Sequence, residues 1–238
     1  MSLYRDEGIV LRTLRLGEAD RIVTMVTKGQ GKVRAVAKGV RRTTSRFGGR
    51  LEPMSHVAMQ CWQGRELDTV TQVEVLDSFR TVREDLARVS KAFTLLEIVD
   101  VLAQERQSNP LLYETLVGAL RWLDNADSPL LVAAFCLKVL VLEGSAPVVD
   151  RCASCGSTSL LVAFDLVEGG VLCRSCRRGR SVSAGALEVV QRILDGGLSS
   201  ALAEPEGPST GEVTDLATEA MEVHLDRRLR SLRSSPIG

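Results

Sequence analysis

Short apolar and alternating stretches, typical of β-strands, fill the first 80 residues of the chain. Five of them occur, at residues 8–16, 22–27, 33–37, 53–62 and 66–75. The sequence KGQGK after the second stretch places two glycines beside a polar residue, which favours a hairpin turn. Five strands without a helical period predict a small, closed or nearly closed β-barrel. Five short strands are what an OB-fold needs, although an SH3-like barrel would give much the same pattern.

The segment 40–50 fits neither the period of a strand nor that of a helix. It consists mainly of Gly, Thr, Ser and Arg, with Phe47 as its one aromatic residue. We expect a long mobile loop on the barrel, with Phe47 exposed.

From residue 82 onward the apolar positions recur with helical spacing. A first helix is predicted with one apolar face formed by Leu86, Val89, Phe93, Leu96 and Ala103. A second helix begins at Asn109-Pro110, and the nearly uniform apolar run 130–142 predicts a third that lies centrally in a bundle. Two more are expected, around 184–194 and from Ser209 to about Leu232, with Ser209-x-x-Glu212 as a capping box.

Two Cys-x-x-Cys pairs stand between these helices. They are Cys152 with Cys155 and Cys173 with Cys176, with 17 residues between the pairs. Two such pairs at this spacing indicate one zinc ion bound by four thiolates. Four protein ligands leave no open position, so we expect a structural site. Two disulfides or four idle thiols are the alternatives.

The other two cysteines, Cys61 and Cys136, lie in apolar stretches and are expected to be small core residues. No disulfide framework is needed, because 45% hydrophobic residues in a chain of 238 can form an ordinary core.

The chain is neutral as a whole, with 30 basic and 30 acidic residues, but its charge is unevenly placed. Residues 28–50 contain no Asp or Glu and eight cations: Lys28, Lys32, Arg34, Lys38, Arg41, Arg42, Arg46 and Arg50. A long basic tract on a β-barrel favours nucleic-acid binding over the alternative of a solvated surface loop.

The way in which nucleic acid would bind follows from the shortage of aromatic residues near the barrel. These are Tyr4, Phe47, Trp62 and Phe79. Base stacking should therefore be limited, and phosphate contacts should dominate. Such a surface would bind single and double strands alike, with weak sequence readout and steep weakening by salt.

Other function classes find little support. The N-terminus is charged where a secretory signal is apolar, and the longest apolar run has 13 residues, so we expect a cytoplasmic protein without a membrane span. The GQGK sequence lacks the glycine and the Ser or Thr of a phosphate-binding loop. His56 and His224 stand without a motif, and no catalytic constellation is found, so no enzyme is expected. Whether Arg174, Arg177, Arg178 and Arg180 contact phosphate or are merely solvated stays open.

Several stretches taken together resemble the RecO family of bacterial recombination-mediator proteins. They are GIVLRTLRLGEADRIVTMVTKGQGKVRAVAKGVRR, LEPMS, VLEGSAPVVDRCASCG and CRSC. The resemblance covers nearly the whole chain in the right order. Met54 departs from it mildly, because an aromatic residue is common at that position.

The resemblance implies an α+β multidomain protein of the RecF pathway. Its expected parts are an OB-fold barrel at 1–80, a helical domain at 81–147 and 182–238, and a zinc-ribbon-like module at 148–181. It implies binding of single- and double-stranded DNA, annealing of complementary strands, and loading of RecA onto DNA coated by single-stranded DNA-binding protein. The implied partners are RecR and the acidic C-terminal tail of that coating protein. The competing interpretation is a zinc-ribbon adaptor that binds RNA or protein in a transcription or ribosome-associated complex.

Overall fold

The computed structural model describes residues 2–42, 45 and 47–232, and it divides into two compact units. The first runs to Asn125 and includes the chain after Leu229, whereas the second spans Ala126–Leu229. The three helices that follow the barrel thus belong to the barrel's unit. The predicted domain boundaries near residues 80, 147 and 181 stay a prediction. No helix in the described part of the chain is long and apolar enough to cross a membrane.

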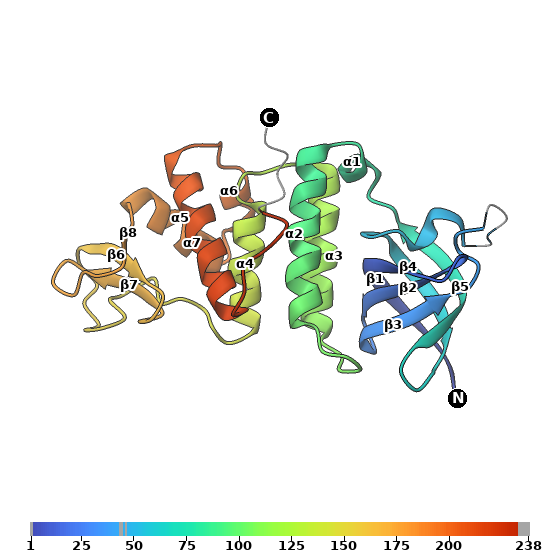
Figure 1. The fold of residues 1–238 in the computed structure, drawn as a ribbon. Helices are drawn as coiled ribbons and strands as arrows, with labels where there is room; N and C mark the ends of the chain where they lie inside the picture. Colours follow the sequence, from blue (N-terminus) through green and yellow to red (C-terminus); the bar gives the residue numbers. More distant parts are fainter. Residues whose placement is uncertain (1, 43–44, 46, 233–238) are drawn as a thin grey trace. The chain divides into compact units, whose positions relative to one another are not determined.

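The first unit contains the predicted five-stranded barrel. Its strands are β1 (Leu3–Leu16), β2 (Asp20–Thr27), β3 (Gly31–Ala37), β4 (His56–Trp62) and β5 (Asp68–Asp77). They close in the order β1-β2-β3-β5-β4, with β4 pairing back onto β1 (Figure 1). All neighbours are antiparallel except β3 and β5, which meet in a short parallel pairing at Ala35–Asp68 and Val36–Thr69. This OB-like barrel confirms the predicted fold class.

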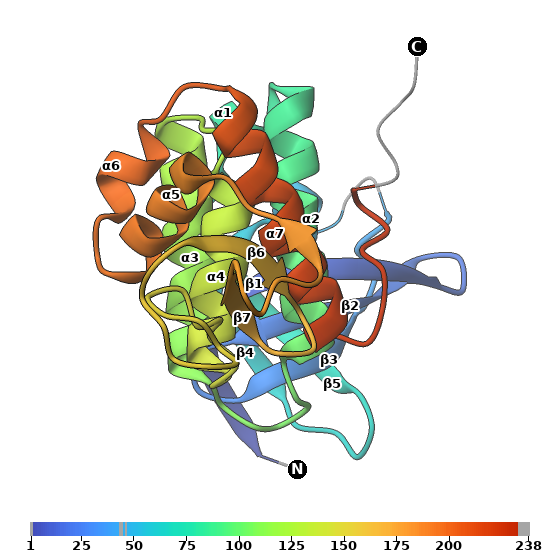
Figure 2. The same ribbon diagram turned by 90° about the vertical axis from the view of Figure 1, so that its left-hand side faces the viewer.

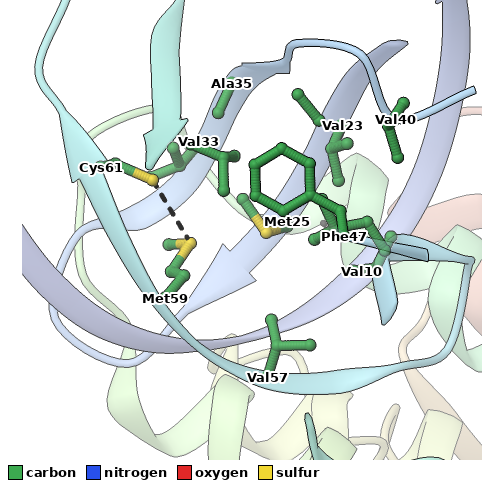
Figure 3. Packing of buried hydrophobic residues seen from close by; sticks show 13 residues of the cluster. Val10, Val23, Met25, Val33, Ala35, Val40, Phe47, Val57, Met59 and Cys61 are labelled. Atoms are coloured by element: carbon green, nitrogen blue, oxygen red, sulfur yellow. Dashed lines mark hydrogen bonds between the residues drawn. The ribbon is translucent and has the colours of Figure 1, made fainter. Parts of the chain in front are cut away.

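Phe47 corrects one expectation, because its ring fills the barrel instead of lying exposed. Its side chain is 1% exposed and packs among inward residues of the strands, including Val23 and Met25 (Figure 3). The turn that follows, Gly48–Leu51, is a short 3-10 helix that also buries Leu51. This segment therefore completes the barrel core between strands. Residues 43, 44 and 46 of this segment lie outside the described residues, and the mobility of the loop 40–50 stays a prediction.

Three helices complete the first unit: α1 (Arg80–Arg83), α2 (Leu86–Leu102) and α3 (Pro110–Asn125). Asp85 caps α2 by accepting hydrogen bonds from the N–H groups of Ala87 and Arg88 at 2.8 and 3.1 Å. The predicted apolar face of α2 is partly wrong, since Leu86 and Phe93 are exposed. The helix instead buries a wider surface, formed by Ala92, Thr94, Leu95, Leu96, Ile98 and Val99, because it packs against α1, α3 and β1.

The connection from α2 to α3 runs along the edge of β3. Lys32 donates its backbone N–H to the carbonyl of Gln104 at 3.0 Å, and Arg106 donates its own to the carbonyl of Lys32 at 3.2 Å. Gly31 makes this approach possible, because it has a φ of +68° and a Cβ there would lie 2.0 Å from the carbonyl oxygen of Gln107. The backbone thus joins the connection directly to the barrel.

The second unit is a helical bundle with a small sheet. Its helices are α4 (Leu131–Leu142), α5 (Ala184–Leu194), α6 (Leu198–Leu202) and α7 (Pro208–His224). As predicted, α4 is buried nearly all round, and it packs beside α5 and α7 (Figure 2). The sheet has the order β7-β6-β8, with β6 (Leu161–Asp165), β7 (Gly170–Cys173) and β8 (Arg180–Ser181). The predicted hairpin between the cysteine pairs is therefore present as β6 and β7.

The predicted capping box of the last helix is wrong, because Glu212 does not close the first turn of this helix. Helix α7 begins at Pro208, and Thr210 closes its first turn by accepting the N–H of Gly207 at 2.8 Å. Glu212 instead reaches to α5, where its carboxylate accepts from the N–H and the hydroxyl of Ser183 at 2.9 and 2.6 Å. The motif joins two helices rather than starting one, and α7 ends at His224.

Candidate nucleic-acid interface and metal centre

The turn that follows β3 folds onto the loop between β1 and β2. Gly39 donates its N–H to a carboxylate oxygen of Asp20 at 2.7 Å, and the N–H of Arg41 donates to the carbonyl of Ala19 at 3.0 Å. The guanidinium of Arg41 also donates to the carbonyl of Glu18 at 2.9 Å. These bonds fix two basic segments of the chain at one corner of the barrel.

Four exposed cations gather there, and we call them the basic corner: Arg15, Lys38, Arg41 and Arg42. Arg15 lies directly opposite Arg21 in the β1–β2 register. Among the described residues, the side chains of Arg15, Lys38 and Arg42 have no hydrogen-bond or ion-pair partner. Sequence reasoning missed Arg15, which lies outside the basic tract. Its position two residues before the β1–β2 loop was the available signal, since this loop binds nucleic acid in OB-folds.

Two cations of the predicted tract face α2 instead. The side chain of Lys32 is 16% exposed, and its ammonium donates to the carbonyl of Asp100 at 2.5 Å and lies 3.7 Å from its carboxylate. Arg34 lies 3.9 Å from the carboxylate of Glu105. A further cation on the same outer surface, Arg12, pairs with Asp100 at 2.7 Å. These pairs hold α2 against the barrel, and a DNA contact of Lys32 or Arg34 stays a prediction.

Lys28 and Arg50 lie on another part of the barrel, where both line a groove of about 1010 Å³. The ammonium of Lys28 is 3.5 Å from the carboxylate of Glu114. The groove has mixed charge, with Arg5, Lys28 and Arg50 opposed by Asp6, Glu7 and Glu74. A phosphate contact of Lys28 or Arg50 therefore stays a prediction. The last cation of the tract, Arg46, lies outside the described residues.

The four cysteines of the two Cys-x-x-Cys pairs meet in the second unit. All four Sγ atoms lie within 4.8 Å of one another, and those of Cys155 and Cys173 are 3.7 Å apart. The first pair sits on a tight turn, in which the N–H of Gly156 donates to the carbonyl of Cys152 at 2.9 Å. The second turn is closed by the N–H of Cys176, which donates to the carbonyl of Cys173 at 3.1 Å. The hairpin thus brings four sulfur ligands to one point.

This arrangement fits a metal ion and does not fit disulfides. Sulfurs placed about 2.3 Å from a tetrahedral zinc are about 3.8 Å apart, close to the separation seen here, whereas a disulfide needs about 2.05 Å. All four cysteines are free. Backbone hydrogen bonds, chiefly from Cys173, lower the pKa of Cys152 to about 6. Hydrogen bonds with the neighbouring sulfurs, Cys155 first, raise the pKa of Cys176 to about 12, because they favour its protonated form.

The arginines near the second cysteine pair differ in their surroundings. Arg178 pairs with Asp165 and Glu168, and Arg180 lies 3.4 Å from Glu219. Arg177 donates to the hydroxyl of Ser181 at 2.8 Å. Of this group, Arg174 is exposed and has no side-chain partner among the described residues. Any phosphate contact in this region should therefore fall first on Arg174.

Cys61, Cys136 and His56 lie in the interior of the protein. Cys61 and Cys136 are fully buried, as expected for small core residues. His56 is buried, and its Nε2 lies 2.8 Å from the hydroxyl of Tyr113. Burial, followed by the charge of Arg121, holds the pKa of His56 below its ordinary value.

Comparison with known proteins gives a single family along the whole chain. The family model "Recombination protein O N terminal" matches residues 1–79, and "Recombination protein O C terminal" matches residues 83–233. A curated relative, the DNA repair protein RecO of Frankia casuarinae, is 42% identical over 238 residues, which cover 98% of each chain. The first matched range ends after the barrel and the second begins just before α2, so the two family models together cover nearly all of the chain.

Proposed function

Because this chain belongs to the RecO family of DNA repair and recombination proteins, we propose that it binds single- and double-stranded DNA through its OB-like barrel. The observation that carries this proposal is the basic corner. Its exposed cations lie at the β1–β2 loop and the turn after β3, and the side chains of three of them have no partner among the described residues. Cations of this kind bind phosphate without reading sequence.

Annealing of complementary strands follows from the same surface. Two strands repel each other through their phosphates, and a protein that neutralises part of this charge lowers the barrier to pairing. Lys38 and Arg42 stand on a turn and not on a rigid strand, which suits contact with strands in no fixed register. The proposed role is non-enzymatic, because it needs charge neutralisation and no bond is made or broken.

The proposal extends to the partners that the family resemblance implies. We propose that the protein helps to load RecA onto DNA coated by single-stranded DNA-binding protein, together with RecR and the acidic tail of the coating protein. This role requires access to chromosomal DNA, so a cytoplasmic location is part of the proposal.

The cysteine centre is proposed to hold one zinc ion through Cys152, Cys155, Cys173 and Cys176. Four thiolates would complete its coordination, so the ion would supply structure and not chemistry. The packing supports this proposal, because the buried core around the site consists only of Cys152, Ala163, Leu172 and Cys173 among the described residues. Metal binding would provide the stability that so small a core lacks.

Fluorescence anisotropy with labelled single-stranded and duplex DNA across a salt series tests the DNA-binding proposal. The variant Lys38→Ala/Arg41→Ala/Arg42→Ala removes three cations of the basic corner. The salt slope of log K should become shallower by about 2 for single strands and about 2.7 for duplex, with roughly 100-fold weaker binding at 0.1 M salt. Strand annealing should slow in parallel.

The matched control is Arg80→Ala, which removes an equally exposed cation from α1, where it pairs with Glu84 at 2.8 Å. Its salt slope should equal that of the unaltered protein. Unchanged affinity and slope in the triple variant would refute the proposed surface. Stronger binding to structured RNA than to either form of DNA would favour the adaptor function instead.

A further inference from the structure

Trp62 differs from the other aromatic residues near the barrel. The rings of Phe47 and Phe79 are buried, and the hydroxyl of Tyr4 donates to the carboxylate of Asp68. Trp62, at the end of β4, is 46% exposed. Of these four aromatic residues, it alone presents a ring that a ligand in solution can cover.

The strand geometry sets the direction of this ring. Met59 and Cys61 of β4 point into the barrel core (Figure 3), so the alternation of a strand directs Gln60 and Trp62 to the outer surface. Trp62 pairs directly with Leu3 of β1, and Gln60 pairs with Arg5. Arg5 is thus the diagonal neighbour of Trp62, about 7–8 Å away and within reach of a long side chain.

On the outer surface of β1, β4 and β5, residues that pair across the three strands form rows, and the charge of the side chains changes from one row to the next. The first row is uncharged and consists of Leu3, Trp62 and Thr69. The second row is polar and cationic, with Arg5, Gln60 and Gln72. The third row, Glu7, Ala58 and Glu74, is acidic and lies about 13 Å from the first, at about 3.3 Å per residue. An anion is therefore favoured only at the Trp62 end of this surface.

A second cation stands on the loop that follows Trp62. Arg65 is exposed, and like Arg5 its side chain has no hydrogen-bond or ion-pair partner among the described residues. The loop is held in place, because Gly64 donates its N–H to Asp68 at 2.9 Å and Gln63 donates its own to the carbonyl of Ser2 at 2.9 Å. The chain also passes close to itself at Gly64, where a Cβ would lie 1.9 Å from the carbonyl oxygen of Leu67.

We propose that Trp62 stacks on an unpaired base of single-stranded DNA while Arg5 and Arg65 contact the neighbouring phosphates. An exposed ring with one uncommitted cation on the paired strand and another on the adjoining loop matches the chemistry of a nucleotide, which offers a flat base and a charged phosphate. The apolar part of the patch is only Leu3 and the indole, which is small for a protein interface. The inference rests on the proposed DNA binding, and it adds a preference for unpaired bases that phosphate contacts cannot give.

Duplex DNA should not use this site, because its bases are stacked and paired inside the helix. The variant Trp62→Ala should therefore weaken single-strand binding about 5- to 10-fold, the lower part of the range for loss of one stacking contact, and change duplex binding less than about 2-fold. Stacking releases no counterions, so the salt plot of the variant should be displaced in parallel, with its slope unchanged.

Two further variants separate stacking from other effects. Trp62→Phe keeps an aromatic ring and should retain single-strand affinity within about 3-fold. Leu76→Ala removes another exposed apolar side chain from the same sheet, 45% exposed on β5, and should have no effect. In a Trp122→Phe background, Trp62 is the one tryptophan left, and its fluorescence should be quenched by single-stranded DNA and not by duplex.

The outcomes distinguish this inference from the DNA-binding proposal. If the basic-corner variant loses affinity for both forms of DNA while Trp62→Ala binds normally, the stacking site is refuted and the phosphate surface stands. Equal weakening of single-strand and duplex binding by Trp62→Ala would also refute stacking. A change in oligomeric state without a change in DNA affinity would make the patch a contact between copies of this chain.

Discussion

Asp68 is the most consequential buried charge of the barrel. Its side chain is 0% exposed, and it accepts hydrogen bonds from the hydroxyl of Tyr4, the guanidinium of Arg106 at 2.5 Å and the N–H of Gly64 at 2.9 Å. It stands where β3 and β5 meet, opposite Ala35. One carboxylate thus joins the start of β1, the loop after β4, the barrel closure and the connection after α2.

The variant Asp68→Asn tests how much this carboxylate stabilises the fold. Removing one partner of a buried ion pair costs about 3–5 kcal/mol. The side chain of Arg106 is 34% exposed and can be solvated in the variant, so we expect a loss of about 2–3 kcal/mol in the free energy of unfolding. Asparagine keeps an oxygen acceptor and a similar volume, and the change therefore reports mainly on the charge.

Urea denaturation followed by circular dichroism measures this loss. The matched control is Glu84→Gln, which breaks the exposed pair with Arg80 on α1 and should cost less than about 0.5 kcal/mol. In a double variant with Arg106→Gln, the two losses should be strongly less than additive, because both remove the same pair. A loss below about 1 kcal/mol for Asp68→Asn, or additive losses in the double variant, would refute this account.

Three further predictions follow from other parts of the chain. Binding of the proposed zinc contributes on the order of 10 kcal/mol, so its chelation should open residues 148–181 to proteolysis. DNA affinity should stay within about 2-fold, and metal analysis of the untreated protein should find one zinc per chain. Burial lowers the pKa of His56, so its contribution to stability is present above the unfolded pKa of 6.5 and is lost as the pH falls toward the folded pKa. The urea midpoint should therefore be lower at pH 5.5 than at pH 7.5, and the difference should be smaller in His56→Gln. Gly31→Ala should cost well over 1 kcal/mol by urea denaturation, because the new Cβ meets the backbone of Gln107, whereas Gly17→Ala, with a φ of +59° but open space, should cost only about 1 kcal/mol.

The features that the sequence predicted well depend on local patterns. Four of the five strands were found within three residues of their ends, because short apolar or alternating runs are a local signal, whereas the first five residues of β1 were missed. The central position of α4 followed from its apolar surface on every side. The meeting of four cysteines followed from two short turns and a hairpin, each of which is encoded within about ten residues.

The features that it predicted poorly depend on partners distant in sequence. Phe47 sits in a polar segment, and its burial is decided by the space inside the barrel, which no local pattern reveals. Glu212 has the spacing of a helix cap, but the donors that it meets are the N–H and the hydroxyl of Ser183, 29 residues earlier. The buried face of α2 was misplaced because three elements pack around this helix.

The basic tract shows why a charge count alone cannot define a DNA-binding surface. Lys32 and Arg34 have the same charge as Lys38 and Arg42 and are close to them in sequence. The difference lies in Asp100 and Glu105, which the fold places against the first two cations and not against the others. Neutralised cations release fewer counterions on meeting phosphate, and they contribute little to affinity or to its salt dependence. The carboxylates on α2 and its connection therefore leave Lys38 and Arg42 available to the proposed DNA-binding surface, where Arg15 joins them from outside the tract.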